Sequence, residues 1–128
     1  NISPVIFMYN FLEKIVTVTE SSIGYIASFH EKYINIEAYY EDRKLIKYAT
    51  IFIPNTKIEL NNKSHWAKIL KKGEICILDN VSKSNDLFWE PVNCTNDKLN
   101  SCIYVPYLFN GQVLGMLCLI REKYYGCY

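Results

Sequence analysis

Two apolar segments of the chain meet at Asn110-Gly111, and this junction constrains the fold more than any other feature. Asn-Gly tolerates the two positive φ angles of a type I′ turn, so residues 101–119 predict a β-hairpin with a two-residue loop. Such a loop sets the register of the strands. The predicted register pairs Phe109 with Gln112, Leu108 with Val113, Tyr107 with Leu114, and Pro106 with Gly115. Both faces are apolar, so we expect a sheet that is covered on both sides.

The two faces of this hairpin differ in the size of their side chains. One face carries only medium and large side chains. The other places Pro106 opposite Gly115, which leaves room beside Tyr104 and Cys102. A packed face and a roomy face predict a core on one side of the sheet and a cavity on the other.

Length and charge limit the class of protein. The 128 residues are half hydrophobic, which is enough for one domain, over residues 1–128, with a single core. With 14 basic and 13 acidic side chains spread evenly, we expect no nucleic-acid partner. The apolar runs are too short for a membrane span, so we expect no membrane contact by this segment. The start lacks a Met and a charged leader, which we interpret as a fragment of a longer protein.

The five cysteines form an odd set without a CxxC spacing. Three of them lie in apolar, strand-like segments, where a free thiol behaves as a small hydrophobic side chain. This usage is typical of a reducing cytoplasm, although four Asn-x-Ser/Thr triplets keep a secreted, glycosylated chain open. The two histidines, His30 and His65, have no cysteine at ligand spacing, so we expect neither a metal nor a cofactor.

The remaining pattern predicts an α+β chain. Pro4 opens a helix with Ser3 as its cap, and a second helix covers His65–Lys72 with Gly73 just beyond its end. Strands are expected at Ser22–Phe29, Tyr33–Tyr40, Tyr48–Ile53 and Ile75–Leu78, and a long loop at Asp79–Lys98.

The first helix has more apolar surface than one sheet contact requires. Its apolar side chains cover about 200°, whereas a helix packed only on its own sheet needs a stripe nearer 100°. The surplus centres on Phe7, Phe11 and Val18. We therefore expect a second partner for this helix, either another copy of the chain in a homodimer or a neighbouring helix outside this sequence.

No catalytic set is expected. The chain contains no GxSxG, no Walker loop and no GxGxxG, and neither histidine is tied to a cysteine by any motif. Glu41-Asp42 stands beside Arg43 and Lys44, which is typical of a solvated charge cluster.

A binding role has more support. Phe88 and Trp89 in the long loop either fold into the core or close over a pocket. Tyr104 either offers its hydroxyl to a cavity or is a core tyrosine bonded to backbone. His65, near a helix start, lies where anions bind, or is simply an exposed cap residue. Trp66 is most simply a core residue. The candidate ligand-binding residues are Tyr104, Trp89, Phe88, Cys102, His65 and Trp66.

The order of predicted elements resembles that of a GAF domain, the small-molecule sensor module of bacterial signalling proteins. The hairpin motif Ser101-x3-Val105-Pro106 with Asn110-Gly111-x3-Gly115-x-Leu117-x-Leu119 carries the resemblance, together with Trp66-x6-Gly73-Glu74 and Asp79. The resemblance implies a GAF/PAS-like antiparallel sheet with helices on one face that can form a dimer bundle. It also implies a loop-covered pocket on the other face, and a parent protein such as a histidine kinase or a cyclic dinucleotide enzyme.

Two motifs of other GAF domains are absent from the chain, and their absence narrows the range of expected ligands. The chain lacks the Cys-His dipeptide of many bilin-carrying GAF domains and the NKxD-type contacts of cyclic nucleotide binders. Our first hypothesis is a non-catalytic, cytoplasmic sensor domain of a two-component or related signalling protein, which signals through helix repacking in a dimer. The alternatives are a thiol-dependent reductase of the free methionine sulfoxide type, using Cys94 and Cys102, and a purely structural dimerisation domain.

Overall fold

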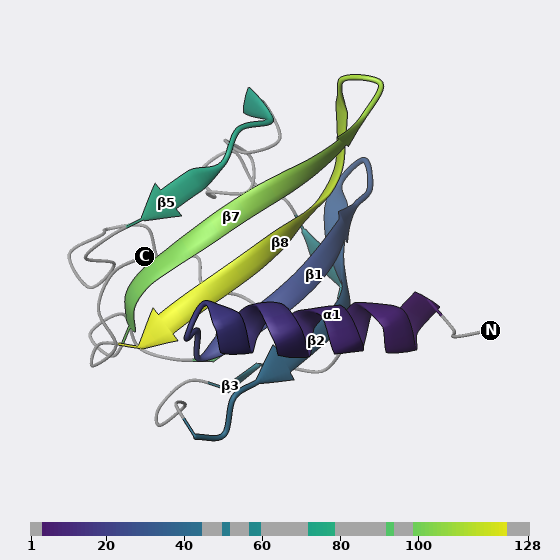
Figure 1. Ribbon diagram of the computed structural model, residues 1–128. Helices are drawn as coiled ribbons and strands as arrows, with labels where there is room; N and C mark the ends of the chain where they lie inside the picture. Colours follow the sequence, from purple (N-terminus) through teal and green to yellow (C-terminus); the bar gives the residue numbers. More distant parts are fainter. Residues whose placement is uncertain are drawn as a thin grey trace.

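The computed structural model describes residues 4–44, 50–51, 57–59, 72–78, 92–93 and 99–122. The elements are α1 (Pro4–Val18), β1 (Ile23–Phe29), β2 (Tyr33–Glu41), β3 (Thr50–Ile51), β4 (Lys57–Glu59), β5 (Cys76–Leu78), β6 (Val92–Asn93), β7 (Leu99–Phe109) and β8 (Gln112–Glu122). Six strands form one antiparallel sheet in the order β4-β2-β1-β8-β7-β5, and β3 pairs with β6. Helix α1 lies across one face of this sheet, along β1 and β2 (Figure 1).

This architecture confirms the expected α+β class. The helix begins at Pro4, and β1, β2 and β5 lie within one or two residues of the predicted strands. The predicted strand Tyr48–Ile53 contains β3. Apart from Lys72, the predicted helix His65–Lys72 lies outside the described residues, as does most of the loop Asp79–Lys98. Within the described ranges, no helix is long and apolar enough to cross a membrane.

Helix α1 ends in a Schellman motif that has glutamate where glycine is usual. Glu20 has a φ of 54°, and its N–H donates to the Thr17 carbonyl at 3.2 Å. The Ser21 N–H donates to the Val16 carbonyl at 2.9 Å, which completes the motif. This turn reverses the chain and leads it directly into β1.

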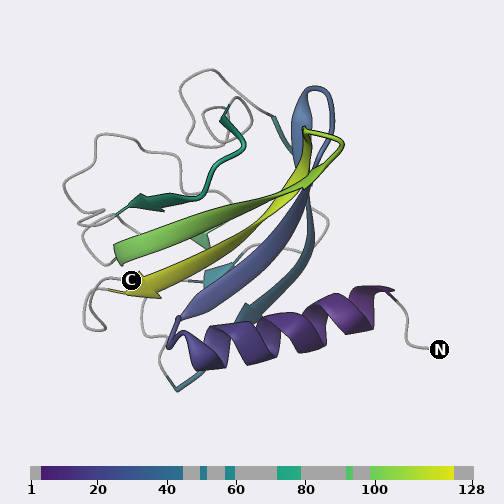
Figure 2. The same ribbon diagram turned by 45° about the horizontal axis from the view of Figure 1, so that its top comes forward.

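The helix packs closely on β1 because Gly24 has no side chain there. A Cβ at Gly24 would lie 2.5 Å from Cγ2 of Val16 and 3.1 Å from Cδ2 of Leu119. Leu12 and Val16, one helical turn apart, are both fully buried against this part of the sheet. Figure 2 shows the helix along the β1–β2 side of this face, with the β7–β5 side of the sheet beyond it.

Hydrogen bonds join the segment between α1 and β1 to the ends of two other strands, β2 and β8. The Ser22 N–H donates to the Ile120 carbonyl at 2.8 Å, and its carbonyl accepts from the Asp42 N–H at 2.9 Å. The Ser22 hydroxyl accepts from the Glu122 N–H at 3.2 Å. Nη2 of Arg121 donates to the carbonyl of Thr19, at the carbonyl-rich end of α1. The ends of α1, β2 and β8 therefore meet at one junction.

The predicted hairpin turn is confirmed, but most of the predicted register is wrong. Asn110 and Gly111 have φ angles of 50° and 76°, and the two pairs next to the turn are as predicted. A bulge at Leu114 then shifts every later pair by one residue. The observed pairs are Tyr107 with Gly115, Pro106 with Met116, Val105 with Leu117, Tyr104 with Cys118, Ile103 with Leu119 and Cys102 with Ile120. The Pro106–Gly115 pair, from which a roomy face was predicted, does not form.

The space beside Gly115 is occupied by the ring of Tyr107. The Tyr107 hydroxyl reaches across β8 and donates to the Ala27 carbonyl on β1 at 3.0 Å. A Cβ at Gly115 would collide with that hydroxyl and with the Ala27 carbonyl oxygen. Glycine at this position thus allows one aromatic ring to cross the hairpin and join β7 to β1.

We predict that Gly115→Ala lowers the free energy of unfolding by about 1–3 kcal/mol, because the added methyl group displaces Tyr107 and crowds β1. Urea unfolding followed by far-UV circular dichroism measures the change. The matched control is Leu114→Ala, an exposed neighbour on the same strand, which should cost less than about 1 kcal/mol. A Gly115→Ala variant as stable as the parent would contradict the proposed packing of Tyr107.

Candidate functional site

The face of the sheet opposite α1 carries a continuous row of tyrosine and cysteine side chains. In register across four strands lie Tyr25 of β1, Cys118 of β8, Tyr104 of β7 and Cys76 of β5. The surrounding cluster is buried and otherwise aliphatic: Ile23, Ala27, Ile34, Ile36, Cys102, Met116 and Ile120. We call this row, together with the surrounding cluster, the tyrosine–cysteine floor. The GAF resemblance places a ligand pocket over this face of the sheet.

Two of the predicted site residues lie in this floor. Tyr104 is 2% exposed and Cys102 is 0% exposed. They are on the predicted face, but the open space predicted beside them depended on the incorrect register. The other four, Phe88, Trp89, His65 and Trp66, lie outside the described residues. The six residues together therefore stay a prediction.

Burial determines the protonation state of the floor. Desolvation raises the pKa of Tyr104 well above its ordinary value, and the neighbouring thiols of Cys102 and Cys118 raise it further. Desolvation and Cys102 also raise the pKa of Cys118 well above its ordinary value, although hydrogen bonds with Tyr25 and Tyr104 oppose this. At neutral pH the Tyr104 phenol and the Cys118 thiol are therefore uncharged.

The uncharged state of Cys118 bears on its reactivity. A protonated thiol is a poor nucleophile, so Cys118 is not an activated cysteine. Cys76, Cys102 and Cys118 form no disulfide bond. In the part of the chain that is described, no group of three or more His, Cys, Asp and Glu side chains is placed to hold a metal ion. The pairing of Cys94 with Cys102 is not tested, because Cys94 lies outside the described residues.

Sequence reasoning missed Tyr25 and Cys118 as neighbours of Tyr104. Tyr25 alternates with Ile23 and Ala27 along a buried strand, so its direction follows from period two. Cys118 was paired with Ile103 because the register ignored the bulge. Proline and glycine within the hairpin strands were the available signals of irregular pairing.

Comparisons with solved structures show that the chain has the fold of GAF domains. The GAF domain of nlh2 from A. aeolicus in an inactive state matches with a TM-score of 0.69 at 14% identity, over 95% of this chain and 70% of that chain. The GAF domain of a two-component sensor histidine kinase from Bacillus halodurans matches with a TM-score of 0.66 at 12% identity, over 96% and 78% of the two chains.

The same fold also occurs in an enzyme. A type II free methionine-R-sulfoxide reductase from Thermoplasma acidophilum matches with a TM-score of 0.65 at 12% identity, over 94% of this chain and 77% of that chain. No family model and no curated protein sequence matches the chain. At these identities the likeness shows the fold and leaves the chemistry to the residues of this chain.

We predict that the protein loses stability at alkaline pH because of the buried phenol and thiol. Cys118 and Tyr104 have ordinary pKa values of 9.0 and 10.0, and both are raised in the folded state. The unfolded chain therefore loses these protons first, so the stabilisation is complete below about pH 9 and decreases as the pH rises further. Urea unfolding at pH values from about 7 to 10.5 measures this decrease.

The control is Cys118→Ala, which removes one of the two fully buried thiols among the described residues. Its free energy of unfolding should fall less steeply than that of the parent between about pH 9 and pH 10. A parent protein whose free energy of unfolding is constant up to about pH 10.5 would contradict the uncharged floor.

Proposed function

We propose that this chain is a non-catalytic sensor domain that binds a small molecule over the tyrosine–cysteine floor and transmits binding through α1. The observation that carries the proposal is the GAF fold combined with a floor in which Cys102 and Cys118 are fully buried and no described cysteine forms a disulfide bond. In this proposal the ligand contacts Tyr104 and Cys102, and Phe88, Trp89, His65 and Trp66 complete the pocket. The parent protein is a signalling protein such as a histidine kinase, and the domain works in the cytoplasm without a cofactor.

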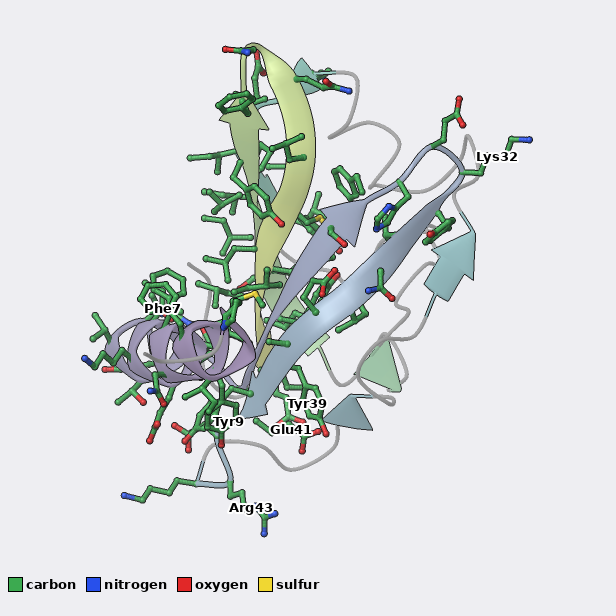
Figure 3. The ribbon with its side chains drawn as sticks, turned by 90° about the vertical axis from the view of Figure 1, so that its right-hand side faces the viewer. Phe7, Tyr9, Lys32, Tyr39, Glu41 and Arg43 are labelled. Atoms are coloured by element: carbon green, nitrogen blue, oxygen red, sulfur yellow. The ribbon has the colours of Figure 1, made fainter. Side chains whose placement is uncertain are left out.

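The proposed output surface is the exposed apolar flank of α1. Phe7, Phe11 and Val18 are 64%, 44% and 79% exposed. At 100° per residue they fall in one stripe, on the flank of the helix away from Tyr9. Figure 3 shows Phe7 and Tyr9 on opposite sides of the helix.

Further exposed apolar side chains lie on the same face of the sheet. Ile77 of β5 and Tyr107 of β7 lie on the α1 face and are exposed. Exposed apolar side chains on one face of a molecule are typical of a protein–protein contact. We infer that a second copy of the chain covers it, so that the first helices of two chains pack together.

We predict that Phe7→Glu combined with Phe11→Glu raises the dimer dissociation constant at least about a hundredfold, because charges replace two rings that the proposed dimer would bury. Sedimentation equilibrium measures the constant. Asn10→Glu is the matched control, since it adds a charge to an exposed position of the same helix and should leave the constant within a few-fold. A double variant that dimerises as tightly as the parent would contradict this surface.

We also predict that Trp89→Ala weakens binding of any metabolite that raises the melting temperature of the protein, because an aromatic wall of the pocket is lost. A thermal-shift screen followed by calorimetry measures the affinities, and Phe109→Ala at the exposed hairpin tip is the control. If no metabolite shifts the melting temperature while the dimer persists, the domain is a structural dimerisation element.

A reductase is the second candidate, because structures of free methionine-R-sulfoxide reductases share the fold. That activity would need a thiolate at Cys94 or Cys102, with their Cα atoms within about 7 Å of each other. Iodoacetamide labelling of the native protein across pH separates the two functions. Rapid alkylation of Cys94 or Cys102 near neutral pH would favour the reductase, and slow alkylation of both favours the sensor.

A further inference from the structure

A cavity of about 400 Å³ lies along the later part of β2, next to α1. Strand β4 pairs with β2 only at Tyr33–Asn35, whereas the cavity is lined by residues of β2 from Glu37 to Glu41. Tyr9 of α1 also lines the cavity, so the helix and the strand both contribute to its wall. Its volume lies within the range of small-molecule sites.

Two tyrosine rings form a corner in this wall. Tyr40 pairs with Gly24, the residue of β1 on which α1 packs, so the Tyr40 side chain lies on the α1 face of the sheet. The rings of Tyr9 and Tyr40 meet there edge to face, with centroids 5.5 Å apart and planes at 71°. Because the planes are steeply inclined to each other, a group in the corner can lie within about 6 Å of both ring centroids.

This aromatic corner is accessible from solvent. Tyr9 is 46% exposed and Tyr40 is half-buried, so neither ring is enclosed in the core. Neither hydroxyl forms a hydrogen bond with another residue in the part of the chain that is described. The two rings therefore keep aromatic surface that a ligand can contact.

Two carboxylates lie beside the corner, one from each element. Glu13 comes one helical turn after Tyr9, on the same flank of α1. Asp42 follows Tyr40 by two residues, and its N–H donates to the Ser22 carbonyl at 2.9 Å, so the alternation of β2 continues to Asp42. Neither carboxylate forms an ion pair with a described residue. Their charges are thus not neutralised by a described neighbour.

The acidity of Tyr40 agrees with this placement. Desolvation raises the pKa of Tyr40, and the charges of Glu13 and Asp42 raise it further. A negative charge is therefore disfavoured at the Tyr40 hydroxyl. By the same electrostatics, a positive charge is favoured beside it.

Arg43 opposes a cation only weakly. Its side chain lines the cavity but is exposed, as is shown in Figure 3 at the end of β2 far from Lys32. An exposed guanidinium group is well screened by water and salt, and it can turn away from a bound cation. The carboxylate of Glu41 lines the same cavity and adds a negative charge.

The chemistry of the corner selects the type of cation. Its surface consists of ring carbons, so a primary ammonium group would lose water without gaining acceptors for its three N–H donors. A quaternary ammonium group has no such donors and is attracted to ring faces through its methyl groups. We propose that the Tyr9–Tyr40 corner binds the trimethylammonium group of a choline-like small molecule. Glu13 and Asp42 supply the compensating negative charge.

The test uses three probes of similar size. Choline carries the trimethylammonium group, 3,3-dimethylbutanol has carbon in place of the charged nitrogen, and ethanolamine lacks the methyl groups. In amide chemical-shift titrations, choline should bind saturably and at least about fivefold more tightly than either of the others, because it alone combines the charge with the methyl groups. The shifts should change around Tyr9 and Tyr40 and not around Tyr104.

Aromatic variants test the two ring faces. Tyr9→Leu and Tyr40→Leu should each weaken choline binding at least about threefold, because each removes one ring face. Tyr40→Phe keeps the ring and should bind choline within about twofold of the parent. Tyr33→Leu is the matched control, since Tyr33 stacks on His30 at the other end of β2, and it should leave choline binding unchanged. Far-UV circular dichroism checks that each variant is folded.

Charge variants should give effects of opposite sign. Asp42→Asn keeps the side-chain acceptor that the Lys44 N–H reaches at 3.0 Å, and Glu13→Gln lies at an exposed position. Each should weaken choline binding about twofold or more, whereas Arg43→Gln should strengthen it about twofold by removing a like charge. None of the three should change the binding of 3,3-dimethylbutanol, which carries no charge.

The proposal is overturned if choline gives no saturable binding, or binds no more tightly than 3,3-dimethylbutanol or ethanolamine. It is also overturned if the chemical shifts change at the floor instead of at the corner, or if Tyr33→Leu weakens choline binding as much as Tyr40→Leu. The sensor function proposed above depends on the floor and on Phe7 and Phe11, so it would stand or fall separately.

Discussion

The close approach of α1 to β1 at Gly24 is the contact on which the rest of the structure depends. Because no side chain stands between them, Leu12 and Val16 are fully buried, and the helix lies directly on the sheet. This position brings Tyr9 beside Tyr40 on one flank of the helix and leaves Phe7 and Phe11 on the other. A larger residue at Gly24 would raise the helix and change both flanks at once.

The junction at Ser22 holds the helix in this position. Ser22 bonds to the ends of both β2 and β8, and Arg121 bonds to the last turn of the helix. The side-chain bonds to β8 join residues 100 and 102 positions apart in sequence, so the order of the chain does not predict them. They join the beginning of the domain to its last described strand, which makes α1 and β8 parts of one rigid unit.

The sequence was sufficient to predict the helix and the strands, but it was not sufficient to predict which residues of the hairpin pair across its two strands. The Asn110-Gly111 turn, the helix from Pro4 and the first two strands follow from local chemistry, and the structure confirms them. The bulge at Leu114 depends on Tyr107 reaching a carbonyl of β1, a contact between segments that are 80 residues apart. No periodicity within the hairpin contains that information.

The candidate site was also predicted only in part from the sequence. The face that carries Tyr104 and Cys102 was predicted correctly from alternation along the strand, because alternation depends only on the residue itself. The open space predicted beside them depended on the wrong cross-strand pairs, because a shift of one residue changes every cross-strand neighbour. The interpretation of Glu41-Asp42 beside Arg43 and Lys44 as a solvated charge cluster agrees with the structure, in which Arg43 and Lys44 are exposed.

In the proposed dimer, α1 would connect a ligand on one flank of the helix to the partner chain on the other. Tyr9 lines a cavity of about 400 Å³ along β2, and Phe7 lies on the opposite side of the same helix. A ligand alters the dimer only if its affinity differs between two positions of the helix. The packing at Gly24 leaves little room for small displacements, and packed contacts of this kind change between discrete arrangements. Because Arg121 of β8 donates to the Thr19 carbonyl at the end of α1, such a change would move the helix together with the last described strand.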